Sequence, residues 1–440
     1  MSEVEQQTPS VIDALREEWP QLSSEDRISR FRSLAHDDAE DFYLSMPAYE
    51  QAALFEDFSR AEKRLWIRFL APDDATDLIQ ELPDDSRAEV LSLVDETARR
   101  EIIALLSYRE DEAGGLMSPR FARVRPDMLV AEAIRYVRQQ ARVVDPIHYI
   151  YVLDSHQHLL GVLSLRQLFT RPAEQKVSEA METELVKVPD EMDQESVSRL
   201  FTQHRYVALP VVDADGRMQG VVTVDDILDV NQEEATEDIQ KLGGMEALDA
   251  PYPEVTLPQM IKKRGGWLTL LFVSEMFTTT AMSHFEEDIA KAVVLAVFLP
   301  LIISSGGNSG SQATTLIIRA LSLQQLRLSD WWRVVIREAI TGFCLGALLA
   351  AVGFTRIMIW PNRETLYTQH YMLVAVAVSL SLVGIVLFGS LIGSMLPFVL
   401  RKLKLDPASA SAPMVATIVD VSGLMIYFGV ARLILKGTLL

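Results

Sequence analysis

The stretch Ala412-Pro-Met-Val-Ala-Thr-Ile-Val-Asp420-Val-Ser-Gly-Leu-Met-Ile-Tyr-Phe428 decides the fold, because it places one carboxylate inside a long apolar segment. A carboxylate at bilayer depth is costly unless it faces a cavity, a partner or an ion. No lysine or arginine lies between Lys404 and Arg432 to neutralise Asp420. Asp420 is therefore either protonated and hydrogen-bonded between helices, or part of a site that handles cations. We expect the second.

Charge divides the chain into two unlike parts. The first 265 residues hold 52 of the 61 acidic and 29 of the 41 basic residues. This acidic part should repel nucleic acid and anionic lipid and attract cations. The single cysteine, Cys344, lies in an apolar segment, which excludes a disulfide framework. The polar N-terminus, residues 1–7, has no signal-peptide pattern, so we expect it to stay in the cytoplasm.

Five apolar segments follow the acidic part, each long enough to span a bilayer. They cover residues 266–284, 290–318, 335–358, 371–400 and 411–436. Basic residues gather before the first segment and in the third and fifth connections, which assigns these to the cytoplasm by the positive-inside rule. The acidic second connection and the fourth, with Arg356, Arg363 and Glu364, are assigned to the outside. Five spans then place the C-terminus outside.

The second apolar segment contains the polar run Gly306-Gly-Asn-Ser-Gly-Ser-Gln312. Irregular backbone at membrane depth survives only inside protein or beside water, and small residues also let helices approach closely. The run is therefore a packing interface or a pore wall with a helix break, and the oxygens of Asn308 and Gln312 favour a pore wall. Glu275 and Glu338 are further acids in the predicted spans; an interfacial position explains either one.

A short repeat occupies the acidic half. Residues 34–47 recur 36 positions later as residues 70–83, and each copy is helical in pattern and expected to be capped by aspartate. This period predicts stacked helical hairpins in a small superhelix. Asp37 and Asp41, like Asp73 and Asp77, are four residues apart on one helix face, where like charges repel. The helix dipole explains the first acid of each pair; the second leaves room for a divalent ion.

A longer repeat has an offset of 59 residues, with Tyr149–Leu168 matching Ala208–Ile227. Each copy predicts a strand, a polar turn, a strand and then a helix capped by Ser164 or Thr223. The repeat resembles a tandem of cystathionine-β-synthase (CBS) domains. Gly220, Val221, Thr223 and Asp226 resemble the ribose-phosphate signature of nucleotide-binding CBS sites, which implies a nucleotide site, ATP among the candidates, at Thr223 and Asp226. Gln167 replaces the acid in the first copy.

A highly acidic segment, residues 225–243, connects this tandem to the membrane part. It has no proline or glycine before Gly243, so we expect a helix. It is either a solvated linker or a surface that takes up cations.

Together these segments resemble the MgtE magnesium channels over nearly the whole chain. The most specific stretches are Gly306–Ala320 and Asp406–Tyr427. The resemblance implies a multi-domain fold: an α-helical N-domain (1–115), α/β CBS domains (116–174 and 175–232), a connecting plug helix and linker (233–262), and a five-span transmembrane domain (263–440). It also implies a homodimer in the bacterial inner membrane, with the lipid bilayer and divalent cations as its partners.

The resemblance further implies residue roles. The ion-selective pore would use Asp420 and the Ala416 carbonyl, with Gly306, Gly307, Asn308 and Gln312 in the pore motif. Intracellular Mg²⁺ would hold the pore shut by bridging acids of the helical, CBS and plug elements. Matching positions are Asp41, Asp73, Asp77, Gly115, Asp193, Glu195, Asp226, Asp229, Glu234, Glu237, Asp238 and Asp406. Ser311, Ala412 and Arg205 depart from the family pattern, and Arg205 stands where an acid is expected.

Two other functions compete with a gradient-driven Mg²⁺ channel. One is a CBS-regulated secondary transporter of another divalent cation or small solute. For an organic acid or anion, such a transporter would need arginine or helix N-termini facing the pathway, and the central spans carry neither arginine nor lysine. A membrane-anchored sensor needs neither Asp420 nor the polar span. No nucleophile–base set and no phosphate-binding loop stands out, so we expect no enzymatic activity and no ATP-driven transport.

Overall fold

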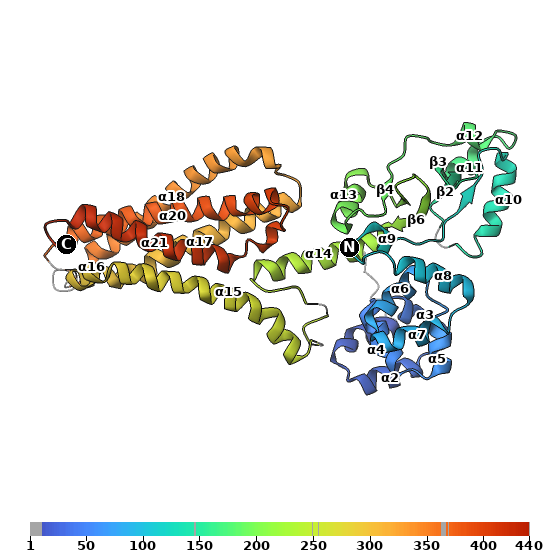
Figure 1. Ribbon diagram of the computed structural model, residues 1–440, viewed down its shortest axis with the longest axis horizontal. Coiled ribbons are helices and arrows are strands. Elements are labelled where there is room, and N and C mark those ends of the chain that lie inside the picture. The colour runs from blue at the N-terminus through green and yellow to red at the C-terminus, as the bar shows by residue number, and fades with distance from the viewer. Residues whose placement is uncertain are drawn as a thin grey trace, which may run out of the picture. The chain divides into compact units, whose positions relative to one another are not determined.

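The computed structural model describes residues 11–144, 147–248, 250–253, 255–361, 367 and 369–439. Arg363, Glu364 and the polar N-terminal residues 1–7, which entered the topology prediction, lie outside this set. The chain divides into two compact units, Met1–Glu233 and Glu234–Leu440. The boundary falls inside one helix, α14 (Val224–Leu242), and each unit is considered by itself (Figure 1).

The first unit begins with a layered helical domain. Its elements are α1 (Val11–Glu18), η1 (Trp19–Gln21), α2 (Ser24–Ser33), α3 (His36–Leu44), α4 (Ala48–Asp57), α5 (Arg60–Trp66), α6 (Pro72–Glu81), α7 (Asp84–Leu91) and α8 (Glu96–Leu105). Helix α2 packs on α4, α4 on α6 and α6 on α8, as the 36-residue period predicts. The core gathers Phe31, Tyr43, Phe58 and Trp66, whose rings contact one another.

The expected aspartate caps of the short repeat are wrong. Ala35 and Ala71 occupy the N-cap positions of α3 and α6, without a side-chain hydrogen bond. The aspartates instead lie in the first turn, where their charge compensates the helix dipole. The first aspartate of each copy thus lies two residues after the N-cap, and the Asp74 carboxylate accepts a backbone hydrogen bond at Ala71.

The rest of the first unit holds two similar three-stranded sheets. Their elements are α9 (Ala113–Leu116), β1 (Arg123–Val124), α10 (Val130–Gln140), β2 (Tyr149–Leu153), β3 (Leu159–Ser164), α11 (Leu165–Thr170), α12 (Val177–Ala180), β4 (Val188–Pro189), α13 (Gln194–His204), β5 (Ala208–Val212) and β6 (Met218–Thr223). In each sheet the central strand pairs parallel with the first and antiparallel with the third. The 59-residue repeat is therefore confirmed.

The two sheets exchange their entry segments. Ser118 exchanges two backbone hydrogen bonds with Val221 of β6, and Glu182 does the same with Val162 of β3. The segment that precedes the first copy thus pairs with the sheet of the second copy, and the segment that precedes the second copy pairs with the sheet of the first. One half would leave these backbone groups without their partners.

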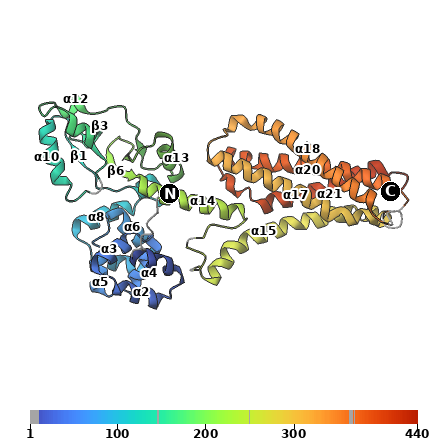
Figure 2. The ribbon, with the colours of Figure 1, turned by 180° about the vertical axis from the view of Figure 1, so that it is seen from behind.

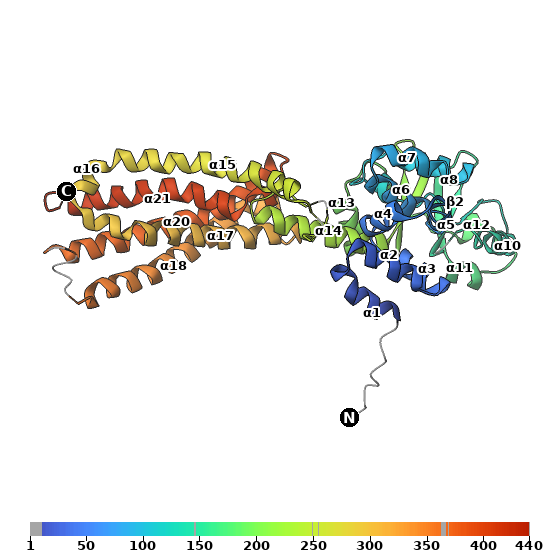
Figure 3. The ribbon, with the colours of Figure 1, turned by 90° about the horizontal axis from the view of Figure 1, so that it is seen from below.

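The second unit is a bundle of long apolar helices. After the end of α14 come α15 (Leu257–His284), α16 (Glu286–Lys291), α17 (Val293–Ser322), η2 (Leu328–Asp330), α18 (Trp331–Ile359), α20 (Tyr371–Lys402), η3 (Pro407–Ser409) and α21 (Ala412–Leu435). Figures 2 and 3 show α17, α20 and α21 side by side, with α18 along α20 and α15 along α21.

Length and composition qualify four described helices to cross a membrane: Val294–Ser322, Leu328–Ile359, Tyr371–Lys402 and Ala412–Leu435. The first predicted span, 266–284, lies in α15, which is long enough but does not meet the apolarity of the others. Glu275 and a run of threonines lower its hydropathy. Its apolar side chains are nevertheless largely uncovered; Phe272, for example, is 70% exposed.

Candidate functional site

Asp420 lies in the interior of α21, well away from its ends. Ser411 caps the helix by accepting a hydrogen bond from the Met414 N–H, and Pro413 occupies its first turn. Within the described residues, the Asp420 carboxylate has neither a hydrogen-bond partner nor an ion-pair partner. Glu275 of α15, another acid, acts on it electrostatically. The described residues of one chain therefore supply no hydrogen bond that would hold the Asp420 carboxylate between helices.

The glycines of α17 pack against its neighbours. A β-carbon at Gly306 would overlap Ile385 of α20 and Val419 of α21. A β-carbon at Gly307 would lie 3.5 Å from the Ala416 β-carbon. The two predicted pore glycines thus allow close approach, and they bring α17 next to the α21 face that carries Ala416, one turn before Asp420.

The opposite side of α17 is polar and uncovered in one chain. Ser304, Asn308, Gln312 and Thr315 are exposed and recur at three- and four-residue intervals, so they form one stripe along the helix. The Asn308 Nδ2 donates to the Ser304 Oγ at 3.4 Å. The expected helix break is wrong, because α17 is continuous from Val293 to Ser322. The small residues serve packing on one face, which leaves the polar stripe free on the other.

A second site lies within the first unit, where α6 meets the start of α14. We call it the acid cluster; its members are Asp73, Asp74, Asp77, Asp225, Asp226 and Asp229. Asp225, Asp226 and Asp229 all act electrostatically on Asp74, and Asp226 also acts on Asp77. The Ser118 hydroxyl, from the segment after α9, donates to the Asp73 Oδ1 at 3.3 Å. Elements from the helical domain, the CBS tandem and the connecting helix thus converge here.

Crowding and mutual repulsion disfavour the ionised form of these acids. Burial, and then the charge of Asp74, raises the pKa of Asp73 to about 6. Burial followed by Asp226 raises the pKa of Asp74 to about 6, and burial with Asp74 and Asp73 raises that of Asp77 well above its ordinary value. Asp74 and Asp77 keep water-exposed surface despite the surrounding protein, so solvent screens part of this repulsion.

Asp226 has two roles. Its Oδ2 accepts hydrogen bonds from the Thr223 N–H at 3.0 Å and the Thr223 hydroxyl at 2.6 Å, which closes the first turn of α14. Burial outweighs these hydrogen bonds and raises the pKa of Asp226 to about 7. Burial and Asp225 also raise the pKa of Asp229. A nearby cation would lower all these pKa values.

The donor chemistry of the acid cluster suits a hard divalent cation, because Mg²⁺ prefers carboxylate oxygens. Among the described residues, no group of three or more acids, histidines or cysteines is arranged to hold a metal ion directly. Mg²⁺ usually keeps several waters and uses one or two carboxylates. The cluster therefore fits a hydrated ion and does not fit an all-protein cage.

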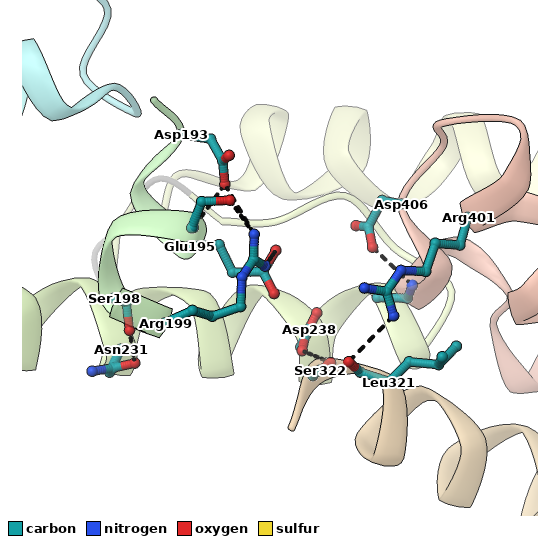
Figure 4. A network of polar contacts seen from close by, with 12 residues as sticks. Asp193, Glu195, Ser198, Arg199, Asn231, Asp238, Leu321, Ser322, Arg401 and Asp406 are labelled. Atoms are coloured by element: carbon teal, nitrogen blue, oxygen red, sulfur yellow. Dashed lines mark hydrogen bonds and ion pairs between the residues drawn. The ribbon is translucent and has the colours of Figure 1, made fainter. Parts of the chain in front are cut away.

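The other predicted regulatory acids of the first unit lie apart. Asp193 caps α13 through the Ser196 N–H, and Glu195 forms a 2.9 Å ion pair with Arg199. Figure 4 shows both acids directed at the Arg199 guanidinium. Asp41 is exposed on α3. These positions remain predictions as cation ligands.

Two further residues singled out from the sequence of the first unit, Gly115 and Arg205, have roles in the local backbone conformation. Gly115 is buried on α9, where a β-carbon would overlap the Arg109 carbonyl, so a glycine is required. Arg205, at the position where the family pattern expects an acid, adopts a left-handed conformation with φ of 56° and ends α13.

The predicted acids of the second unit contact a lysine. Lys241 Nζ lies 2.7 Å from Asp406 Oδ2 and also pairs with Glu237. Burial lowers the pKa of Lys241, but its hydrogen bonds to Asp406 and Glu237 outweigh burial and raise it. The Ser322 hydroxyl donates to Asp238 at 3.4 Å, as Figure 4 shows. Glu234 is half-buried on the same helix.

Sequence reasoning missed Asp74, Asp225 and the ends of the polar stripe. The doubled aspartates in both copies of the short repeat were a usable signal for Asp74, and the Asp225-Asp226 pair was one for Asp225. The spacing of Ser304 and Thr315 around Asn308 could have revealed the stripe. The four-residue spacing of Glu237 and Lys241 was a local signal for one partner of this lysine. Its pairing with Asp406 has no local signal, because Asp406 is 165 positions away.

Comparisons with known proteins agree with the division of the chain into a helical domain, a CBS tandem and a membrane bundle. A family of divalent cation transporters, MgtE, matches residues 299–430. The MgtE intracellular N domain matches residues 12–111, and the CBS domain matches 113–174 and 177–233. The Magnesium transporter MgtE of Thermus thermophilus is 38% identical over 95% of this chain and 92% of that protein. The Bacillus subtilis protein of the same name is 29% identical over 87% and 91%.

Shorter matches cover only parts of the chain. A solved structure of the cytosolic domain of the Mg²⁺ channel MgtE in complex with ATP is 37% identical; it covers 50% of this chain and 90% of that one, with a TM-score of 0.47. Inosine-5'-monophosphate dehydrogenase of Aquifex aeolicus is 29% identical over 27% of this chain and 24% of the enzyme. Most of that enzyme therefore has no counterpart here.

The chain is thus a multi-pass membrane protein with CBS regulatory domains, of the class of divalent cation transporters. Its similarity to the Thermus thermophilus protein extends over nearly the full length of both chains. It belongs to the MgtE family of magnesium transporters.

Proposed function

We propose that the chain forms a Mg²⁺-selective, gradient-driven channel that intracellular Mg²⁺ closes. The observation that carries this proposal is Asp420, a carboxylate without a protein partner among the described residues, beside Ala416 and a neighbouring polar helix. Two such carboxylates would give a negative site without a closed cage. Weak, water-mediated binding lets an ion enter and leave again.

A homodimer follows from the polar stripe of α17. Exposed Asn308 and Gln312 would be unfavourable against lipid, so a second chain and water should cover them. A two-fold axis along this face would place both copies of Asp420 around one pathway. The electrical gradient then supplies the driving force, about 4.6 kcal/mol for a divalent cation across about 100 mV, twice the single-charge value.

Closure by Mg²⁺ follows from the acid cluster. Without a cation, like charges on α6 and α14 repel, and the elements that carry them separate more easily. A divalent cation favours the closed arrangement only by its greater affinity for that arrangement. The resemblance of Thr223 and Asp226 to the nucleotide-binding CBS signature also supports a nucleotide site at the start of α14, which would add a second regulatory ligand.

The proposal also covers the orientation of the chain in the membrane and its assignment as a transporter. The N-terminus and acidic domains face the cytoplasm and the C-terminus faces outside, which the basic connections support. The chain acts as a transporter and not as an enzyme, in line with the names of its relatives. A secondary transporter of another divalent cation is the remaining alternative, and Co²⁺, Mn²⁺ and Ca²⁺ competition distinguishes it.

The test is Mg²⁺ uptake into proteoliposomes with internal Mg²⁺ varied. Wild-type flux should fall as internal Mg²⁺ rises, and Asp420→Ala should abolish selective uptake while the protein stays folded and dimeric by size-exclusion chromatography. Glu287→Gln, an acid in the short connection after α15, is the matched control and should conduct normally. Normal Mg²⁺ uptake by Asp420→Ala would remove Asp420 from the mechanism.

A further inference from the structure

A lysine near the end of α14 lies between two acids, one on α14 itself and one just before η3. Lys241 Nζ contacts Asp406 Oδ2 at 2.7 Å and pairs with Glu237 one helical turn earlier. All three side chains are partly enclosed: 27% of the Lys241 side chain is exposed, 37% of Asp406 and 36% of Glu237. Enclosure of this degree reduces screening by solvent.

The neighbouring contacts hold Asp406 and α14 in place. Asp406 Oδ1 accepts a hydrogen bond from the Ala408 N–H at 2.8 Å, so its second oxygen is directed at Lys241. Leu242 packs against an apolar group of Ile318, Ala408 and Ala410. In Figure 4 the Arg401 guanidinium, which donates a hydrogen bond to the Leu321 carbonyl, lies near Asp406.

We propose that Lys241 is a built-in cation that joins Glu237 to Asp406, so that this end of the connecting helix docks on the membrane domain without Mg²⁺. We call the three residues the lysine latch. One consequence of the latch rests on the proposed function: the acid cluster, and not this contact, makes channel closure depend on Mg²⁺. The latch itself is a statement about one contact and can be tested without ion flux.

The geometry favours the lysine over a free ion at this place. An ammonium group has three donors, enough for both carboxylates, and Lys241 follows Glu237 by four residues, the favourable order on a helix. The covalent tether keeps this charge present at any Mg²⁺ concentration. A divalent cation would have to expel it, so Mg²⁺ gains little differential affinity for the docked state here.

Removal of the lysine should turn the latch into a divalent-cation site. Lys241→Met keeps the apolar stem and deletes the charge, which leaves Glu237 and Asp406 close together and unneutralised. Docking should then weaken in the absence of divalent ions and recover when Mg²⁺ bridges the two acids through its waters.

The experiment measures docking by cross-linking in the full chain. Cysteines replace Leu242 and Ala408, which belong to one apolar contact, in a Cys344→Ser background, and a short bismaleimide joins them. With Lys241 present, the cross-linking rate should change less than about twofold between Mg²⁺-free and millimolar Mg²⁺. In Lys241→Met it should fall about tenfold without Mg²⁺, equivalent to roughly 1.4 kcal/mol, and recover with Mg²⁺.

Two control variants keep the test sharp. Lys241→Arg retains a cation and should behave as the parent, whereas Lys262→Met removes an exposed lysine and should have no effect. Asp406→Asn combined with Lys241→Met should lose less than the sum of the single effects, because the two residues act as one pair.

Three results would overturn the latch. They are a Mg²⁺ dependence of the parent as large as that of Lys241→Met, an unchanged rate in Mg²⁺-free Lys241→Met, and a loss in Lys241→Met that Mg²⁺ does not restore. Each can occur while Asp420-dependent flux stays normal. Failure of the latch and failure of the channel assignment are therefore distinguishable.

Discussion

Neutralising Asp226 should make the acid cluster less sensitive to both pH and Mg²⁺. In Asp226→Asn the amide oxygen can still accept hydrogen bonds from Thr223, so the first turn of α14 is preserved, while the charge is gone. The raised pKa of Asp226, about 7 instead of 3.8, means that the folded cluster favours the protonated acid. Protonated Asp226 therefore stabilises the folded cluster fully below a pH of about 4, and this stabilisation is lost as the pH rises through about 7.

The size of the effect follows from the same pKa. A shift of about three units corresponds to on the order of 4 kcal/mol against the ionised form above pH of about 7. This is an upper limit, because part of the carboxylate remains in contact with water. Asp73 and Asp74, with pKa values of about 6, add to the same trend and lose their stabilising effect as pH rises through that value.

Hydrogen–deuterium exchange of α6 in the full-length protein measures this effect. After correction for the chemical exchange rate, wild-type protection should be high at pH of about 5, low at pH of about 8 without divalent ions, and restored at pH of about 8 by millimolar Mg²⁺. Asp226→Asn should lose less protection than wild type between these pH values and gain less from Mg²⁺, because only Asp73, Asp74 and Asp77 still titrate in α6. Asp57→Asn, an exposed acid at the end of α4, is the matched control and should resemble wild type. A pH and Mg²⁺ response in Asp226→Asn equal to that of wild type would refute the reasoning.

Two other changes test the remaining parts of the argument. Neutralising Glu234, Glu237 and Asp238 together should leave the channel open at high internal Mg²⁺, and inhibition of flux at the wild-type Mg²⁺ concentration would contradict this. Gly389→Ala should destabilise the bundle by about 1–3 kcal/mol through overpacking, because its β-carbon would overlap an α17 carbonyl. Gly429→Ala, where a β-carbon meets open space, should leave the thermal unfolding temperature unchanged; equal losses for both glycines would exclude this packing role.

Most of the architecture could be predicted from the sequence, because it depends on local patterns. The two repeats, at offsets of 36 and 59 residues, predict the helical layers and the paired sheets. The uninterrupted acidic run predicts the helix that the structure has at Val224–Leu242. The position of Asp420 within an apolar segment predicts an acid at membrane depth that needs a cavity, an ion or a partner, because an isolated carboxylate there is costly.

Tertiary structure alone decided which predicted residues work together. The polar run of α17 mixes glycines with serines and amides, so its local pattern does not distinguish a helix break from a two-faced helix. The structure has a continuous helix, with Gly306 packed against α20 and α21. Folding of the first unit brings Asp73 and Asp77 close enough to Asp226 to interact with it electrostatically. Lys241 and Asp406 meet across 165 positions. Charges so far apart in the chain interact only when the fold brings them within a few ångströms, because water screens them otherwise.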